Sequence, residues 1–348
     1  MQRRAFLRNA GAAGAALLAG CGSAPTGSTD GTLQVATYPS YVDAPSSSAG
    51  SYLKEEFDSR FDATLEWIPL EGELNHFIQR RQQGVGIDAD VYAGIRQMDL
   101  VRIEQQLEEP LFQATPPSEL ENGGSLKDDY LFDSDERVIP TGGSYVSLVY
   151  DEDAVQPETY EDIAESDQDI LIPSPPSTTT GRMFLLMTIN QFGEDGYLDY
   201  WSRLSENLTV TGDWGSAYTA YENREAAMIT SYSTDQVYAS QGDSPMSRHQ
   251  IGFPNGQGYS YIGGAARFAN TDKPDLANKF LNFLLEPEVQ AEMAQLNVGI
   301  PATTNAALPE DYSKYVYEPE TTVRFSKERL ANNLSTWTNE WSEQFASN

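Results

Sequence analysis

VIPTGGSYVSLVYD (residues 138–151) is the stretch of sequence that decides the fold. Its β-branched and aromatic residues predict one long strand, which Gly142-Gly143 interrupts near its middle. A second stretch, YSYIGGAARF (259–268), repeats this pattern around its own glycine pair. Two long strands that each carry a glycine pair are typical of a double hinge between two lobes.

Strands and helices alternate on both sides of residues 138–151, which predicts sheets with crossover helices. Strands are expected at 33–38, 64–70, 88–95, 169–175 and 250–254. Helices are expected at 52–61, 73–84, 99–106, 181–193, 197–204, 275–285, 287–296 and in the tail, 320–346. A helix–strand unit is expected within residues 211–234.

This pattern predicts an α/β fold with two lobes, each a mostly parallel sheet with helices on both faces, joined by two hinge strands. Residues 33–141 and 264–348 are expected to form lobe one, and residues 142–263 lobe two. Ligands of such sheets bind outside the carboxyl ends of the strands, so a cleft between the lobes is the expected site.

The first 20 residues predict an export signal. Arg3 and Arg4 precede an apolar run of small residues, which resembles a twin-arginine signal. Leu18-Ala19-Gly20-Cys21 resembles a lipobox, so Cys21, the single cysteine, is expected to carry a lipid. Residues 21–32 are rich in Gly, Ser and Thr and are expected to form a flexible tether. The mature chain is therefore predicted to lie, lipid-anchored, at the extracellular face of the membrane.

The charge balance excludes some partners. Lys and Arg number 22 and Asp and Glu 52, so the net charge is −30 and nucleic acid is not an expected partner. The acidic residues are spread along the whole chain, which favours a haloarchaeal-like, solvated coat for concentrated salt. An ordinary acidic protein is the alternative.

Motifs of catalysis are absent from the sequence. It contains no P-loop, dinucleotide-binding, GxSxG, HExxH or CxxC pattern. His76 and His249, the only histidines, lie in a helical pattern and a polar loop, and are expected to be ordinary residues. We therefore expect no enzyme, no metal site and no cofactor, and predict a binding protein.

Several pieces of the chain resemble the substrate-binding lipoproteins of thiamine ABC transporters. The most particular pieces are Trp214-Gly-Ser-Ala-Tyr218 and Ser231-Tyr-Ser-Thr234. Other pieces are VATYPSY, PLEGELNHFIQR, DADVYAGI, PSPPSTTTG and KPDLANKFLNFLLEPEVQ, and together they are distributed over residues 32–346. The resemblance implies a periplasmic-binding-protein-like fold that takes thiamine or its phosphates. It also implies a monomer that delivers the ligand to an ABC permease and its ATPase.

Thiamine combines a flat aminopyrimidine, a cationic thiazolium and a hydroxyethyl arm, and aromatic faces hold a flat cation well. Tyr38 ends the first strand, and Tyr232 and Tyr238 follow a strand of the other lobe. The resemblance adds Trp214 and Tyr145. Ser231 belongs to the same cluster as Tyr232. Packing within the core or on the surface is the alternative for each tyrosine.

Polar residues are expected at both ends of the ligand. Glu71 and Glu73 could neutralise the cation, or could simply complement a helix dipole. Ser177, Thr178 and Thr179 precede a helix and resemble the loop that meets the hydroxyl or phosphate end, while plain helix capping would also explain them.

Three departures from the family pattern affect the ligand. Arg96 stands where the family has an acid, and its charge suits a phosphate better than a bare cation. A family aromatic is replaced near Val298, and a family Trp is missing from residues 42–52. A polyamine or ferric-iron binder is the nearest alternative, and an exported hydrolase or an adhesive protein is the more distant one. Asn207 and Asn333 fit the glycosylation pattern.

Overall fold

The computed structural model describes residues 31–43, 48–240, 242 and 245–345. The predicted signal peptide, Cys21 and nearly all of the predicted tether lie outside the described residues. Within them, ten strands form one mixed sheet in the order β2-β1-β3-β9-β4-β7-β5-β6, with β10 beside β9 and β8 beside β4. The strands are β1 Thr32–Thr37, β2 Thr64–Pro69, β3 Val91–Ile95, β4 Val138–Tyr150, β5 Ile170–Pro173, β6 Leu208–Thr211, β7 Met228–Tyr232, β8 Gln250–Gly252, β9 Gln257–Arg267 and β10 Thr321–Val323.

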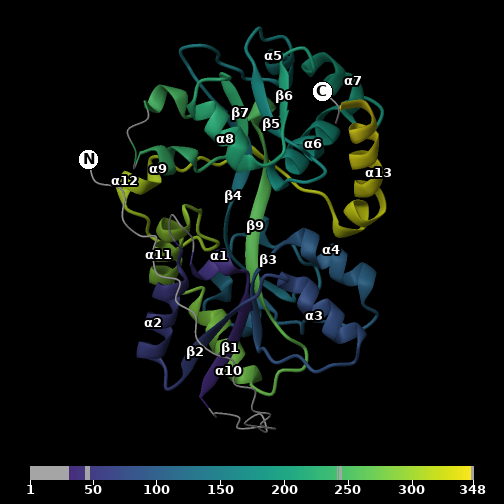
Figure 1. Ribbon diagram of the computed structural model, residues 1–348. Helices are drawn as coiled ribbons and strands as arrows, with labels where there is room; N and C mark the ends of the chain where they lie inside the picture. The colour runs from purple at the N-terminus through teal and green to yellow at the C-terminus, as the bar shows by residue number, and fades with distance from the viewer. Residues whose placement is uncertain (1–30, 44–47, 241, 243–244, 346–348) are drawn as a thin grey trace, which may run out of the picture. The chain divides into compact units, whose positions relative to one another are not determined.

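Helices cover the sheet at both ends of β9, as Figure 1 shows. Around one end lie α2 Gly50–Arg60, α3 Glu73–Gln82, α4 Gln97–Gln106 and α10 Pro274–Phe283. Around the other end lie α5 Tyr160–Ala164, α6 Thr179–Phe192, α7 Tyr197–Leu204 and α8 Trp214–Glu222. The remaining helices are α1 Pro39–Val42, α9 Asp235–Ala239, α11 Pro287–Asn297, α12 Glu310–Ser313 and α13 Lys327–Phe345.

The two long strands β4 and β9 lie antiparallel at the centre of the sheet. Each joins a parallel trio: β3 pairs with the end of β9, and β7 pairs with the end of β4. The trios are β2-β1-β3 and β7-β5-β6, and all their internal pairings are parallel. The predicted fold class, two mostly parallel sheets connected by two long strands, is therefore confirmed.

The glycine pairs of β4 and β9 lie side by side. Gly142 pairs with Gly263, Pro140 pairs with Gly264, and the register shifts between Pro140 and Gly142. Gly142 has a φ of +150°, and a Cβ on Gly143 would lie 2.5 Å from the carbonyl oxygen of Tyr261. The paired strand β9 therefore excludes a side chain at Gly143, which fits the predicted hinge.

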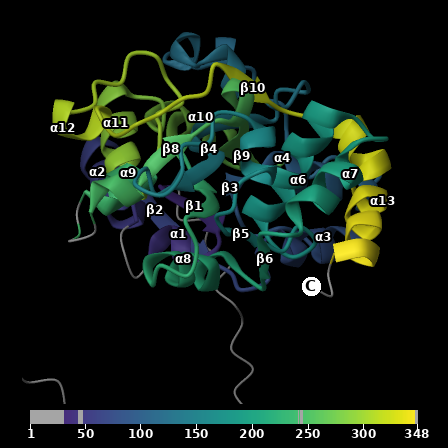
Figure 2. The same ribbon diagram turned by 90° about the horizontal axis from the view of Figure 1, so that it is seen from above.

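Two large hydrophobic clusters hold the sheet ends. One contains Leu33, Phe57, Tyr92 and Phe280 among others. The other contains Trp201 of α7 and is completed by Trp337, Trp341 and Phe345 of α13. The rings of Trp201 and Trp341 meet edge to face with centroids 5.2 Å apart, and α13 lies beside α7 in both views (Figures 1 and 2).

The C-terminal tail differs from its predicted form. Residues 321–323 form β10, which pairs in parallel with β9, so the prediction of a helix there is wrong. These residues pair with Gln257–Tyr259 at the start of β9, and pairing in a sheet requires an extended backbone. Because α13 packs in the second cluster, we propose that it belongs with lobe two, and the other lobe boundaries stay as predicted.

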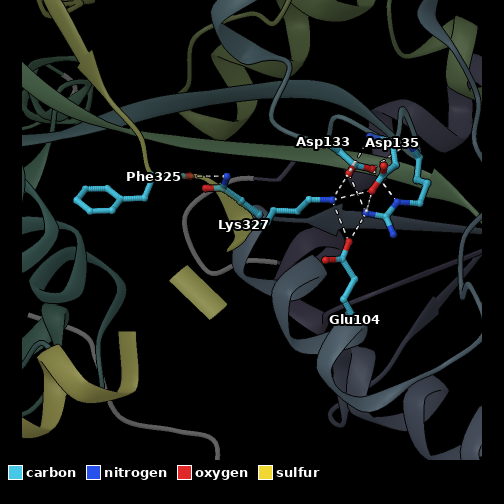
Figure 3. A network of polar contacts seen from close by, with 7 residues as sticks. Glu104, Asp133, Asp135, Phe325 and Lys327 are labelled. Carbon is cyan, nitrogen blue, oxygen red and sulfur yellow. Dashed lines mark hydrogen bonds and ion pairs between the residues drawn. The ribbon is translucent and has the colours of Figure 1, made fainter. Parts of the chain in front are cut away.

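A network of charged side chains links Lys327 in the C-terminal tail to Glu104 on α4 (Figure 3). Lys327 Nζ lies 2.9 Å from Glu104, 2.8 Å from Asp133 and 2.9 Å from Asp135, and Arg137 joins the same acids. Burial alone would raise the pKa of Asp133, but hydrogen bonds from Arg137 and Lys327 outweigh it and lower that pKa to about 2. The three acids are thus held together by two side-chain cations.

Among the described residues, no helix has the length and apolar character needed to cross a bilayer. Asn207 is buried, and its amide nitrogen donates to the carbonyls of Ile163, Ser166 and Gln168. A glycan at this position would break those hydrogen bonds. Asn333 lies on α13, and its amide nitrogen donates to the carbonyl of Arg329.

Candidate functional site

A cavity of about 340 Å³, the larger of two neighbouring cavities, lies where β1 and β3 end beside the glycine pairs of β4 and β9. Its size is within the usual range of small-molecule sites. It is lined by Tyr38, Ser40, Tyr41, Gly94, Arg96, Thr141, Gly142, Gly143, Ser144, Tyr261, Gly263, Met293, Ala294, Asn297, Val298, Gly299, Ile300 and Pro301. Residues from both sides of the hinge therefore meet here.

Tyr38 follows β1, and its ring lies over the backbone of β3. A Cβ on Gly94 would be 2.5 Å from Cε1 of that ring, and the φ of Gly94 is +91°. Glycine alone suits both the space and the backbone conformation. The sequence of β3 thus makes room for a site residue that β1 supplies.

Gly94→Ala should therefore disturb both the fold and the site. A side chain at this φ costs about 1–3 kcal/mol, and it also displaces the Tyr38 ring. Urea unfolding should show that loss of stability, and calorimetry should show weaker ligand binding. Gly86→Ala is the matched control, because an added Cβ there meets nothing within 4 Å. Equal effects of the two substitutions would contradict this role of Gly94.

Arg96 lines the cavity and lies close to two aromatic rings. Its guanidinium carbon is 5.5 Å from the centroid of Tyr38 and 5.0 Å from that of Tyr261. Burial alone would lower the pKa of Arg96, but the negative charges that Tyr261, Tyr38 and Asp99 carry when ionised outweigh it and raise that pKa. Arg96 is thus a firmly charged group whose aromatic neighbours come from both sides of the hinge.

Tyr261 was missed by the sequence reasoning. It lies two residues before Gly263 on β9, so both face the same side of the strand and both line the cavity. That spacing within the predicted hinge strand was the available signal.

Trp214, Ser231 and Tyr232 come together beyond Tyr261. Trp214 Nε1 donates to Ser231 Oγ at 3.1 Å, and the rings of Trp214 and Tyr232 are 5.9 Å apart. Tyr232 in turn contacts Tyr261, with ring centroids 5.3 Å apart. These three predicted residues therefore do not line the larger cavity. They are linked to it by the contact between Tyr232 and Tyr261, which does line it.

The structure does not bring Tyr145 and Tyr238 to the larger cavity. Tyr145 is buried in the first hydrophobic cluster, and its hydroxyl donates to Asp129 Oδ2 at 3.1 Å. Tyr238 is 54% exposed, and its ring meets Tyr218 edge to face at 6.0 Å.

Glu71 and Glu73 are both exposed and lie near the start of α3. Burial raises the pKa of Tyr38, and the charge of Glu73 adds to that increase, so Glu73 is electrostatically close to the site. Glu73 also has a φ of +46°, which is uncommon for a residue with a side chain. Neither carboxylate lines the larger cavity.

The loop before α6 contributes mostly capping. Thr178 Oγ1 accepts from the backbone N–H of Gly181 at 3.2 Å, which is the N-cap that the alternative interpretation expected. Ser177 is exposed, and its hydroxyl lies 3.4 Å from the carbonyl oxygen of Gly212. Thr179, in contrast, lines a second cavity.

This smaller cavity of about 150 Å³ shares Arg96 and Tyr261 with the larger one. It lies between the first turns of α4 and α6. Its lining residues are Arg96, Gln97, Met98, Asp99, Phe132, Thr179, Arg182, Met183, Leu186, Tyr259, Ser260, Tyr261, Ile262 and Arg324. The two cavities together form a site with an aromatic part and a part that is rich in arginine.

Known proteins resemble this chain in sequence and structure over most of its length. The thiamine-binding periplasmic protein of Escherichia coli (strain K12) is 26% identical over 316 residues, which are 89% of this chain and 92% of that protein. The solved structure of a periplasmic thiamin binding protein is 25% identical, with a TM-score of 0.72, over 92% of this chain and 99% of that chain. A ferric binding protein from Campylobacter jejuni is 17% identical, with a TM-score of 0.69, over 89% of this chain and 98% of that chain, and shows a likeness of fold alone.

A model of the family described as bacterial extracellular solute-binding proteins matches residues 89–318. That span is more than half of the chain, and it includes both hinge strands and most of the residues that line the two cavities. The chain belongs to the bacterial extracellular solute-binding protein family.

Proposed function

We propose that this chain captures thiamine or a thiamine phosphate in the larger cavity and delivers it to the permease and ATPase of an ABC importer. We further propose that it is exported through the twin-arginine signal, anchored by a lipid on Cys21 and coated by acidic residues for concentrated salt. The chain then acts as a monomeric carrier without a catalytic step of its own.

The observation that carries the proposal is the group formed by Tyr38, Arg96 and Tyr261 at the hinge. It places two aromatic rings, contributed by both sides of the hinge, and a cation among the residues that line a cavity of about 340 Å³. The relatives named as thiamine-binding proteins match this chain over nearly its whole length.

Two features favour a phosphorylated form. Arg96 already lies against the faces of Tyr38 and Tyr261, so its charge would repel the thiazolium and attract a phosphate. A family aromatic is replaced near Val298, which lines the larger cavity, so the resemblance implies that one stacking face is missing from the site.

The alternatives fit the described residues less well. A polyamine needs carboxylates along its groove, and no Asp or Glu is among the described residues that line the larger cavity. Ferric iron needs phenolates, and Tyr232, the tyrosine of the predicted cluster, does not line the larger cavity. Spermidine, as a polyamine, and Fe³⁺ are therefore both included in the titration that tests the proposal.

Titration calorimetry of the untethered protein in high salt, with thiamine, thiamine monophosphate, spermidine and Fe³⁺, tests the proposal. We expect binding of the thiamine compounds only. Tyr261→Ala should weaken that binding about 5- to 30-fold, because a desolvated cation–π or stacking contact contributes about 1–2 kcal/mol. Tyr317→Ala, at an exposed tyrosine that lines neither cavity, is the control. Binding of spermidine or iron in place of thiamine would refute the assignment.

A further inference from the structure

Three arginines line the smaller cavity, although the chain as a whole has a net charge of −30. Arg96 follows β3, Arg182 lies in the first turn of α6, and Arg324 follows β10. These positions are far apart in the sequence, and the fold brings them to one space. Like charges repel one another, so such a group needs a compensating negative charge.

The protein itself supplies only part of that charge. Within the described residues, none of the three arginines forms an ion pair with a carboxylate. One acid, Asp99, lines the cavity, but both of its oxygens are engaged. Oδ2 accepts from the Arg96 backbone N–H at 3.0 Å, and Oδ1 accepts from Arg102 Nη2 at 3.2 Å. Positive charge therefore remains in excess.

Backbone carbonyls hold two of the arginines. Arg182 Nη2 donates to the carbonyl of Pro176 at 2.9 Å. Arg324 Nη1 donates to the carbonyls of Asp129 at 3.0 Å and Leu131 at 3.1 Å. A guanidinium has five N–H donors, so each keeps donors for a ligand. Burial lowers the pKa of Arg182, as expected for a cation that is partly removed from water without a counter-ion.

We propose that the smaller cavity is an oxyanion subsite that takes the phosphoryl group of the bound solute, with Arg96, Arg182 and Arg324 as its donors. The planar guanidinium matches a pair of phosphate oxygens, and such charge-assisted bonds are among the strongest in proteins. Thr179 adds a hydroxyl at the N-terminus of α6, a 14-residue helix whose dipole favours an anion there.

This inference rests on the proposed function in one respect: the proposed function places the rings of the solute in the larger cavity. The two cavities share Arg96 and Tyr261, so they are adjacent, and the inference requires that a single ligand reaches both. The volume of about 150 Å³ leaves room for a phosphoryl group, since one water needs only about 10–15 Å³.

The test is calorimetry at fixed ionic strength with inorganic phosphate, thiamine and thiamine monophosphate. Arg182→Gln and Arg324→Gln should each lower the affinity for the monophosphate at least tenfold and change that for thiamine less than twofold. Arg203→Gln is the control, because this exposed arginine forms no ion pair among the described residues and its loss changes the net charge equally. Weak competition by inorganic phosphate assigns the subsite to the solute's own phosphoryl group, and competition as strong as the monophosphate's assigns it to free phosphate.

The outcomes separate this inference from the proposed function. Equal binding of thiamine and the monophosphate, with no loss in either variant, overturns the subsite and leaves the thiamine assignment standing. Phosphate binding that both variants abolish, without any thiamine binding, supports the subsite and refutes the thiamine assignment. Losses in the two variants no larger than in Arg203→Gln also overturn the subsite. Should Arg182→Gln fail to fold, the exposed Arg324 decides the question alone.

Discussion

Replacing Arg96 with glutamine should lower the affinity for thiamine monophosphate about 10- to 100-fold, while the affinity for free thiamine stays the same or rises. A hydrogen bond from a charged donor contributes about 1.5–3 kcal/mol, which the neutral amide does not replace. Removing the cation also frees the faces of Tyr38 and Tyr261 for the ligand's rings. Opposite effects on two ligands of the same ring system would identify Arg96 as the residue that selects between them.

Calorimetry with both ligands measures this selection, and Arg96→Lys provides the matched variant. Lysine keeps the charge but lacks the planar fork, so it should recover part of the monophosphate affinity. A greater loss for thiamine than for its phosphate would contradict the role proposed for Arg96. A thermal melt of each variant checks that the fold is retained.

Trp341→Ala should destabilise the protein by about 3–5 kcal/mol, the usual range for removing a buried Trp or Phe from a core. The Trp341 side chain has no solvent exposure, and it packs against Trp201 and Phe345. Its loss leaves a cavity between α13 and α7 that the helices can only partly fill by moving closer.

Urea unfolding in high salt measures the change in the free energy of unfolding. Glu343→Ala, two residues away on the exposed side of α13, should change it by no more than about 0.5 kcal/mol. A loss below about 1 kcal/mol in Trp341→Ala would show that α13 contributes little to the second cluster.

The main strands and helices could be predicted because their signals are local. Residues 138–150 form β4 almost as expected from their β-branched and aromatic composition, and the glycine pairs indicated the crossing with β9. The short helices α1, α5, α9 and α12 have only four or five residues each, too few to show a period of 3.6. β10 could not be predicted because its partner lies more than 50 residues earlier in the chain.

The site could be predicted only in part. Tyr38 and Arg96 immediately follow strands, and the carboxyl ends of strands are where such sheets bind ligands. Tyr145 shows the limit: Ser144 lines the larger cavity, so the next side chain along the strand points to the opposite face, into the core. Whether a side chain faces the ligand site or the core changes with each position along the strand. The composition of the strand does not reveal which positions face which side.

Residues that only the tertiary structure brings together could not be predicted as neighbours from the sequence. Arg182 and Arg324 belong to unrelated segments and reach one cavity only when α6 and β10 flank β9. His249 was expected in a polar loop, but it is buried and its Nδ1 lies 2.7 Å from Asp235. That pairing depends on how α9 packs against β8.

Because α13 packs in the second cluster and α2 packs in the first, the two helices offer attachment points for a pair of dyes. Glu343 is exposed on α13, and Glu55 is exposed on α2, which packs in the first cluster through Leu53 and Phe57. Cysteines placed at these positions, once Cys21 is removed, would carry a donor and an acceptor dye. Energy transfer between the dyes would then give a fluorescent readout of solute capture, without a label near the binding cavities.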